Sequence, residues 1–143
     1  MKFLPLGMLL ISMTTHANSN FGVWGTTCND DGFYIEINNK PSLLIVNDNQ
    51  IVINMHSKEV DNNNYYIFFD SVADLGRGGM NLDWKHVSPT KPVAELSIIN
   101  QNGNLQWKGF YDDMKMKYFW IKDPDFVQSY AENGVITLHK CEK

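Results

Sequence analysis

The chain has 143 residues, with 12 basic and 16 acidic side chains and a formal net charge of −4. Nucleic acids and anionic membrane surfaces recruit proteins through clustered positive charge, so this acidic balance excludes both as expected partners. It favours a dissolved protein whose partner, if charged, is cationic.

The first seventeen residues, 1–17, have the pattern of a secretory signal peptide. Lys2 supplies the positive start, Phe3 to Met13 form a short apolar stretch, and Thr15-His16-Ala17 offers small residues for cleavage. A stretch of this length is too short for a membrane anchor, which needs about twenty apolar residues. We therefore expect export to the periplasm or the exterior, cleavage near Ala17, and no membrane insertion of the mature form.

Residues 18–143 are expected to form a single β-domain. Cleavage would remove Lys2 and no acidic residue, which leaves a net charge near −5. The only two cysteines, Cys28 and Cys141, stand near the two ends of this domain. An even pair in an exported protein predicts a disulfide, which requires that the first and last strands lie side by side or face each other. Two cysteines are only half of a zinc site, so we expect no metal there.

Alternation of apolar and polar residues with period two dominates the domain. The stretch Gly32 to Asn38 places Phe33, Ile35 and Ile37 on one face. Similar short runs follow, separated by turn-forming residues. These runs are Ser42–Val46, Gln50–Met55, Asn64–Asp70, Val93–Asn100, Asn104–Asp112, Lys115–Lys122 and Gly134–Cys141. The pattern predicts an all-β fold of about eight or nine short strands, as a small antiparallel barrel or as a sandwich.

Several connections carry residues that favour tight turns. Asn47-Asp48-Asn49 separates two expected strands, and Glu132-Asn133-Gly134 precedes the last one. Gln101-Asn102-Gly103-Asn104 contains Asn-Gly, the strongest short hairpin signal, because a type I′ turn needs positive φ at both central residues. The segment Pro124 to Ala131 is the one place where we expect a helical turn.

A glycine-rich loop near the middle of the chain holds its only arginine, Arg77. Three glycines surround Arg77, and Met80 follows them. Two interpretations stand: Arg77 pairs with Asp74 and holds the loop together, or Arg77 is exposed and binds a carboxylate of another molecule through its planar bidentate fork. We favour the second, because glycines have no side chains with which to cover a buried ion pair. Arg77, Asp74 and Met80 are therefore candidate partner-binding residues.

One predicted hairpin is rich in aromatic residues. Simple alternation places Trp107 and Tyr111 on one face of it and Phe110 on the other. Both faces therefore carry aromatic side chains, more than a single core needs. The second face serves either as cross-strand packing or as an exposed patch, since tyrosine and tryptophan anchor many interfaces. We count Trp107, Tyr111 and Trp120 among the candidate partner-binding residues.

The sequence contains no motif for catalysis. No serine stands in Gly-x-Ser-x-Gly, both cysteines are assigned to the disulfide, and the histidines lack metal-ligand spacing. The pairs Asp30-Asp31 and Asp112-Asp113 stand at expected turns, where aspartate bonds its own backbone. A carboxylate pair that works as a glycosidase acid and nucleophile stays as an alternative. We expect no catalytic residue, no metal and no cofactor.

Two short segments resemble known families. Gly22-x-Trp24 resembles the Gly-x-Trp that opens calycin barrels such as lipocalins, in which the tryptophan packs against an arginine of a late strand; here the only arginine is mid-chain. Cys28–Asn38, together with the final Leu-His-Lys-Cys, is similar to small periplasmic lysozyme inhibitors of the C-type class, although their Ser-Gly-x-x-Tyr motif is absent. The first resemblance implies a barrel that carries a ligand, and the second a barrel that binds a protein.

Together these patterns predict a soluble exported domain that recognises or neutralises another protein of the cell envelope, as lysozyme inhibitors and immunity proteins do. Acidic charge would steer such a domain to a cationic partner such as lysozyme. The alternative is a calycin-like carrier of a small apolar ligand. A third hypothesis is a small enzyme that uses surface carboxylates.

Overall fold

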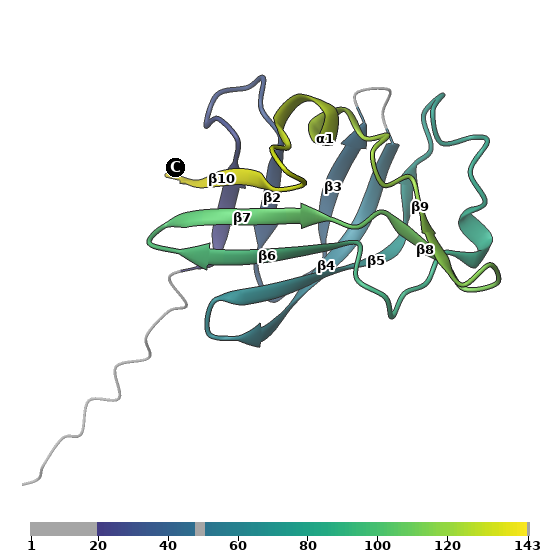
Figure 1. The fold of residues 1–143 in the computed structure, drawn as a ribbon, viewed down its shortest axis with the longest axis horizontal. Coiled ribbons are helices and arrows are strands. Elements are labelled where there is room, and N and C mark those ends of the chain that lie inside the picture. Colours follow the sequence, from purple (N-terminus) through teal and green to yellow (C-terminus); the bar gives the residue numbers. More distant parts are fainter. Residues whose placement is uncertain (1–19, 48–50, 143) are drawn as a thin grey trace, which may run out of the picture.

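The computed structural model describes residues 20–47 and 51–142, which contain a nearly closed antiparallel β-barrel (Figure 1). The signal-like segment and the turn residues Asp48 and Asn49 lie outside the described residues. The strands are β1 Gly22–Gly25, β2 Tyr34–Ile37, β3 Ser42–Asn47, β4 Ile51–Asp61, β5 Asn64–Asp74, β6 Ala94–Ile99, β7 Asn102–Trp107, β8 Phe110–Asp112, β9 Lys117–Phe119 and β10 Ile136–Cys141. Two short helices, the 3-10 helix η1 Trp84–His86 and α1 Asp125–Tyr130, complete the fold. The predicted all-β class is confirmed.

One sheet wraps around to form the barrel. Its eight strands follow the order β2-β1-β10-β7-β6-β5-β4-β3, and each neighbouring pair is antiparallel. β8 and β9 form a separate hairpin. The edge strands β2 and β3 approach each other where residues 38–41 join them, and there the Ser42 hydroxyl donates a hydrogen bond to the Glu36 carbonyl oxygen over 3.4 Å. We call the boundary between β2 and β3 the seam.

The disulfide joins Cys28 to Cys141, whose Cα atoms are 5.4 Å apart. β1 pairs with β10, and Val23 lies opposite Cys141. Both expectations from the cysteine positions, the bond itself and the adjacency of the first and last strands, are confirmed. In the chain-entropy model, a bond across a sequence separation of 113 residues stabilises the fold by about 4–5 kcal/mol.

The core fills the inside of the barrel. Phe33, Ile35 and Ile37 are all buried, as the alternation of β2 predicted. Trp24 and Tyr65 are among the largest fully buried side chains. Large inward-facing side chains therefore occupy the positions that line the barrel interior.

The β6–β7 turn lies two residues earlier than predicted. Its central residues are Asn100 and Gln101, with φ of 50° and 65°, and Ile99 pairs with Asn102 across it. The predicted turn at Asn102-Gly103 is therefore wrong. The same Asn-Gly signal does form a turn with positive φ at Asn133-Gly134, where φ is 52° and 79°.

Gly103 is a core position of β7, where it lies between Ile98 and Leu138 on the neighbouring strands. A Cβ atom added there would stand 3.0 Å from Leu96 Cδ1 and 3.4 Å from Trp24 Cε3. Glycine at this position thus avoids crowding by Leu96 and Leu138 of the neighbouring strands and is not explained by turn geometry.

The aromatic hairpin also differs from simple alternation. Trp107 and Phe110 were expected on opposite faces, yet both are buried in the core, so that expectation is wrong. Gly109, with φ of 94°, redirects the chain between β7 and β8 and restarts the alternation. A Cβ at Gly109 would overlap the carbonyl oxygen of Phe119, so only glycine fits this redirection.

The predicted helical turn at 124–131 is confirmed as α1. Its buried Phe126 stacks on Phe33 with ring centroids 4.1 Å apart, and it meets Trp107 edge-on at 5.3 Å. α1 therefore covers the barrel end beside β2 and β3 (Figure 1). Within residues 20–47 and 51–142, no helix is long and apolar enough to cross a membrane.

Candidate functional site

The glycine loop, residues 75–83, leads from β5 into η1 and lies at the same end of the molecule as the β8–β9 hairpin (Figure 1). The backbone of this hairpin is joined to η1, because the Asp113 amide donates to the His86 carbonyl oxygen over 2.9 Å. Val87 and Asp112 form a β-bridge beside that bond. We call residues 75–86 together with the hairpin turn 113–116 the loop end.

The backbone of the glycine loop is fixed from two sides. The Gly79 amide donates to the Leu75 carbonyl oxygen over 2.9 Å, and the Trp84 indole donates to the Gly79 carbonyl oxygen over 2.8 Å. A Cβ at Gly79 would overlap the Leu75 carbonyl, so this tight turn requires glycine. The Trp84 ring in turn packs edge-on against the buried Phe110, with ring centroids 4.9 Å apart. The loop is therefore anchored to the core.

Arg77 is exposed at the tip of this loop. The carboxylate of Asp74 accepts a hydrogen bond from the Gly76 amide over 3.0 Å, and none of the ion pairs formed by the described residues joins Arg77 to Asp74. Met80 on the same loop is 70 % exposed. Asp74 thus shapes the start of the loop, while Arg77 and Met80 project into solvent.

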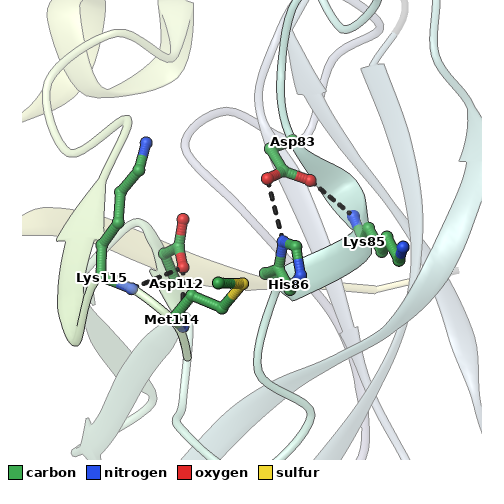
Figure 2. A network of polar contacts seen from close by, with 6 residues as sticks. All are labelled: Asp83, Lys85, His86, Asp112, Met114 and Lys115. Carbon is green, nitrogen blue, oxygen red and sulfur yellow. Dashed lines mark hydrogen bonds and ion pairs between the residues drawn. The ribbon is translucent and has the colours of Figure 1, made fainter.

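The hairpin turn beside the loop is shaped by Asp112. This side chain is only 3 % exposed, and its Oδ1 accepts hydrogen bonds from the amides of Met114 and Lys115, each over 2.9 Å (Figure 2). The turn that results leaves Met114 and Met116 70 % and 75 % exposed. Two thioether side chains therefore stand at the same end of the molecule as the loop tip.

Asp83 and His86 hold η1 in place between the two loops. Asp83 Oδ1 accepts from the Lys85 amide over 3.2 Å, and Asp83 Oδ2 lies 3.0 Å from His86 Nδ1 (Figure 2). The hydrogen bond from His86 is the main reason that the pKa of the Asp83 carboxyl is lowered from its ordinary value. Both carboxylate oxygens are thus engaged in structure.

The three aromatic candidates lie apart from the glycine loop, on or next to the hairpin. Trp107 is buried, and its indole donates to the Trp120 carbonyl oxygen over 3.1 Å. Trp120 is half-buried and stacks near Phe110 at 6.4 Å. Tyr111 is half-buried and meets Tyr118 edge-on at 5.0 Å. Trp107 therefore belongs to the core, and Tyr111 and Trp120 offer only part of their surface.

Asp112 bonds the backbone of its own turn, as the sequence predicts for the Asp112-Asp113 pair, whereas Trp84 and the two hairpin methionines were not among the predicted site residues. Trp84 acts through its packing on Phe110, which depends on the folded arrangement, so no local pattern indicates it. A signal for Met114 and Met116 was present in the sequence. Met114 and Met116 alternate with lysines in a polar turn. Lysines are mostly exposed, so the methionines between them were to be expected on the surface as well.

The loop end offers a guanidinium and soft apolar groups, without an arranged nucleophile and base. Across residues 20–47 and 51–142, no three His, Cys, Asp or Glu side chains gather as metal ligands would. Comparison with family models, curated proteins and solved structures finds no match to this chain.

Proposed function

We propose that this protein is an exported binding module that recognises or neutralises another protein of the cell envelope through the loop end. One observation carries the proposal: Arg77 and Met80 are exposed on a loop whose backbone Trp84 ties to the core. Arginine and methionine are enriched at protein interfaces. A loop that is already ordered loses little conformational entropy on binding, which favours affinity.

The chemistry of the loop end indicates what it would recognise. The guanidinium of Arg77 suits a carboxylate of the partner, which it can bind through two parallel hydrogen bonds. Met80 on the same loop is flexible and polarizable, so it can pack beside that contact, and Met114 and Met116 add exposed apolar surface at the same end of the molecule. The partner would therefore present an acidic group surrounded by apolar surface.

An inhibitor or immunity role is the form of recognition that we favour. The signal-like segment and the disulfide support a periplasmic or secreted location, where disulfides persist. The net negative charge would steer the domain toward a cationic protein. We prefer this role to that of a carrier because large side chains such as Trp24 and Tyr65 occupy the inward-facing positions. We prefer it to catalysis because Asp83 and Asp112 are already bonded to backbone amides.

Photo-crosslinking in cells tests the proposal. A photoreactive residue replaces Met80, and in a matched control it replaces Val60, which is 51 % exposed near the opposite end of the β4–β5 hairpin. We expect a protein adduct from position 80 and none from position 60. The absence of an adduct at both positions, or the same adduct at both, would contradict recognition through the loop end.

A further inference from the structure

A second surface lies at the seam, where the barrel stays open. Among the strands of the described residues, β3 pairs only with β4, so its other side is a free edge. The contact of Ser42 with Glu36 closes one end of the seam. Toward the other end, the seam opens into a groove of about 750 Å³ that α1 also lines. Figure 1 shows α1 next to β2 and β3.

The wall of this groove formed by β3 is apolar. Leu43 and Ile45 point outward from β3, are 60 % and 59 % exposed, and line the groove. Edge strands are commonly protected from pairing by charged residues, proline or bulges. β3 carries no charged residue, and its irregularity is a register shift between Ile45 and Asn47. The free backbone edge of β3 is therefore flanked by the exposed apolar side chains of Leu43 and Ile45 and has no charge to repel another strand.

The far end of the groove is acidic. Asp30, Asp31 and Asp125 line it, and no lysine or arginine does. Asp30 and Asp31 come just before β2, which starts at Tyr34, and so they lie at the end of the seam away from the Ser42 contact. A segment that enters the open end of the seam would meet these carboxylates first.

We propose that the seam accepts an extended segment of another protein, which adds to the free edge of β3 as a further strand. Its main chain would pair with β3, and its apolar side chains would cover Leu43 and Ile45. Lysine or arginine at its leading end would meet Asp30 and Asp31. A second copy of this chain fits less well, because it would bring its own carboxylates and net negative charge to the same place. The seam does not involve Arg77, so this surface is additional to the loop end.

The direction of pairing defines a probe for this surface. An antiparallel strand on β3 begins where β3 ends, so its basic residues belong at its N-terminus. The probe is a seven-residue peptide with two lysines followed by alternating valine and threonine, and its control has two glutamates in place of the lysines. Both are titrated into the purified, disulfide-bonded protein and followed by the backbone amide signals of β3 in NMR. We expect the basic peptide to shift the β3 signals and to bind at least about tenfold more tightly than the acidic peptide.

Variants decide between this proposal and its rivals. Ile45→Lys places a charge on the free edge and is expected to weaken the basic peptide at least about tenfold. Val60→Lys, at another exposed apolar position, is expected to leave binding unchanged. Melting curves check that both variants are folded. Arg77→Ala is expected to leave the peptide affinity unchanged, which separates failure at the seam from failure at the loop end.

Three results would overturn the proposal. In the first, the basic and acidic peptides bind equally. In the second, folded Ile45→Lys binds the basic peptide as tightly as the wild type. In the third, sedimentation shows that the wild type is a dimer which Ile45→Lys dissociates, because a second copy would then cover the edge.

Discussion

The indole of Trp84 donates a hydrogen bond to the carbonyl oxygen of Gly79 over 2.8 Å. Since Trp84 also packs against Phe110 in the core, this bond ties the glycine loop to the rigid part of the molecule, beside the packing of Leu82 on the core. Gly79 has no room for a Cβ atom, so the loop cannot easily adopt a different turn at this point. Arg77 and Met80 therefore project from a defined base.

Trp84→Phe tests this connection. Phenylalanine keeps an aromatic ring against Phe110 but has no N–H for the Gly79 carbonyl. We expect a loss of about 1 kcal/mol in the free energy of unfolding and faster amide hydrogen exchange in residues 75–83. Denaturant unfolding and exchange mass spectrometry measure the two effects, with the exposed neighbour Lys85→Ala as control. Unchanged exchange in the loop would mean that other contacts fix it.

The pair formed by Asp83 and His86 predicts a dependence on pH. The pKa of Asp83 is lowered in the folded state, mainly by the hydrogen bond from His86. A carboxyl with a depressed pKa stabilises the fold above its unfolded pKa of about 3.9, and this contribution is lost as pH falls through the folded pKa. Asp83→Asn should therefore lower the melting temperature at about pH 6, and the difference from the wild type should shrink by about pH 2. A difference that stays constant over this range would contradict the role of the ionised carboxylate.

Substitutions at Gly103 and Gly134 distinguish side-chain crowding from backbone strain as the cause of a loss of stability. Gly103→Val is expected to destabilise the fold by about 1–3 kcal/mol because its side chain meets Leu96 and Leu138. The control is Gly134→Ala, where φ is 79° and an added Cβ has no neighbour within 4 Å, so that only strain of about 1–2 kcal/mol applies. In a Leu96→Ala background the cost of Gly103→Val should fall and that of Gly134→Ala should not. Equal costs in both backgrounds would refute the packing explanation.

The β6–β7 turn offers a stabilising change. Gln101 has φ of 65°, a conformation that is strained for a residue with a side chain. Relief of this strain in Gln101→Gly should therefore raise the free energy of unfolding. The greater conformational entropy of glycine in the unfolded chain opposes this gain, so that the net increase is at most about 1 kcal/mol. Gln106→Gly, in the middle of β7, should instead lower it. Denaturant unfolding of both variants checks the position of the turn, and a loss of stability in Gln101→Gly would place the turn elsewhere.

The parts of the fold that follow local rules were predictable from the sequence. Period-two alternation predicted that Phe33, Ile35 and Ile37 share a buried face, and the cysteine positions predicted the pairing of the first and last strands. The turn at Asn102-Gly103 was not predictable by the same rules. Gly103 is crowded by Leu96 and Leu138 of the neighbouring strands, and an Asn-Gly pair looks the same whether a turn or close packing between strands favours the glycine.

The candidate site was predictable only in part. The three glycines indicated that Arg77 has no cover, and it is exposed. Trp84, which fixes the glycine loop, was not predictable, because its packing on Phe110 is set by how η1 meets the hairpin. Asp112 was predicted to bond the backbone of its own turn, and it does so. The face of Trp107 was assigned incorrectly relative to Phe110, since alternation was carried through Gly109, where the chain changes direction.

The most direct test of the account is the affinity of the partner crosslinked at position 80 for Arg77→Ala, measured by titration calorimetry beside the melting temperature. Because Arg77 forms no ion pair with the described residues, the melting temperature should stay nearly unchanged. Binding should weaken by about 2 kcal/mol or more. Arg77→Lys should recover only part of that loss, because an ammonium cannot form the bidentate contact, and Lys58→Ala on the exposed part of β4 should lose nothing. If the partner binds Arg77→Ala as tightly as the wild type, the loop end is not the interface.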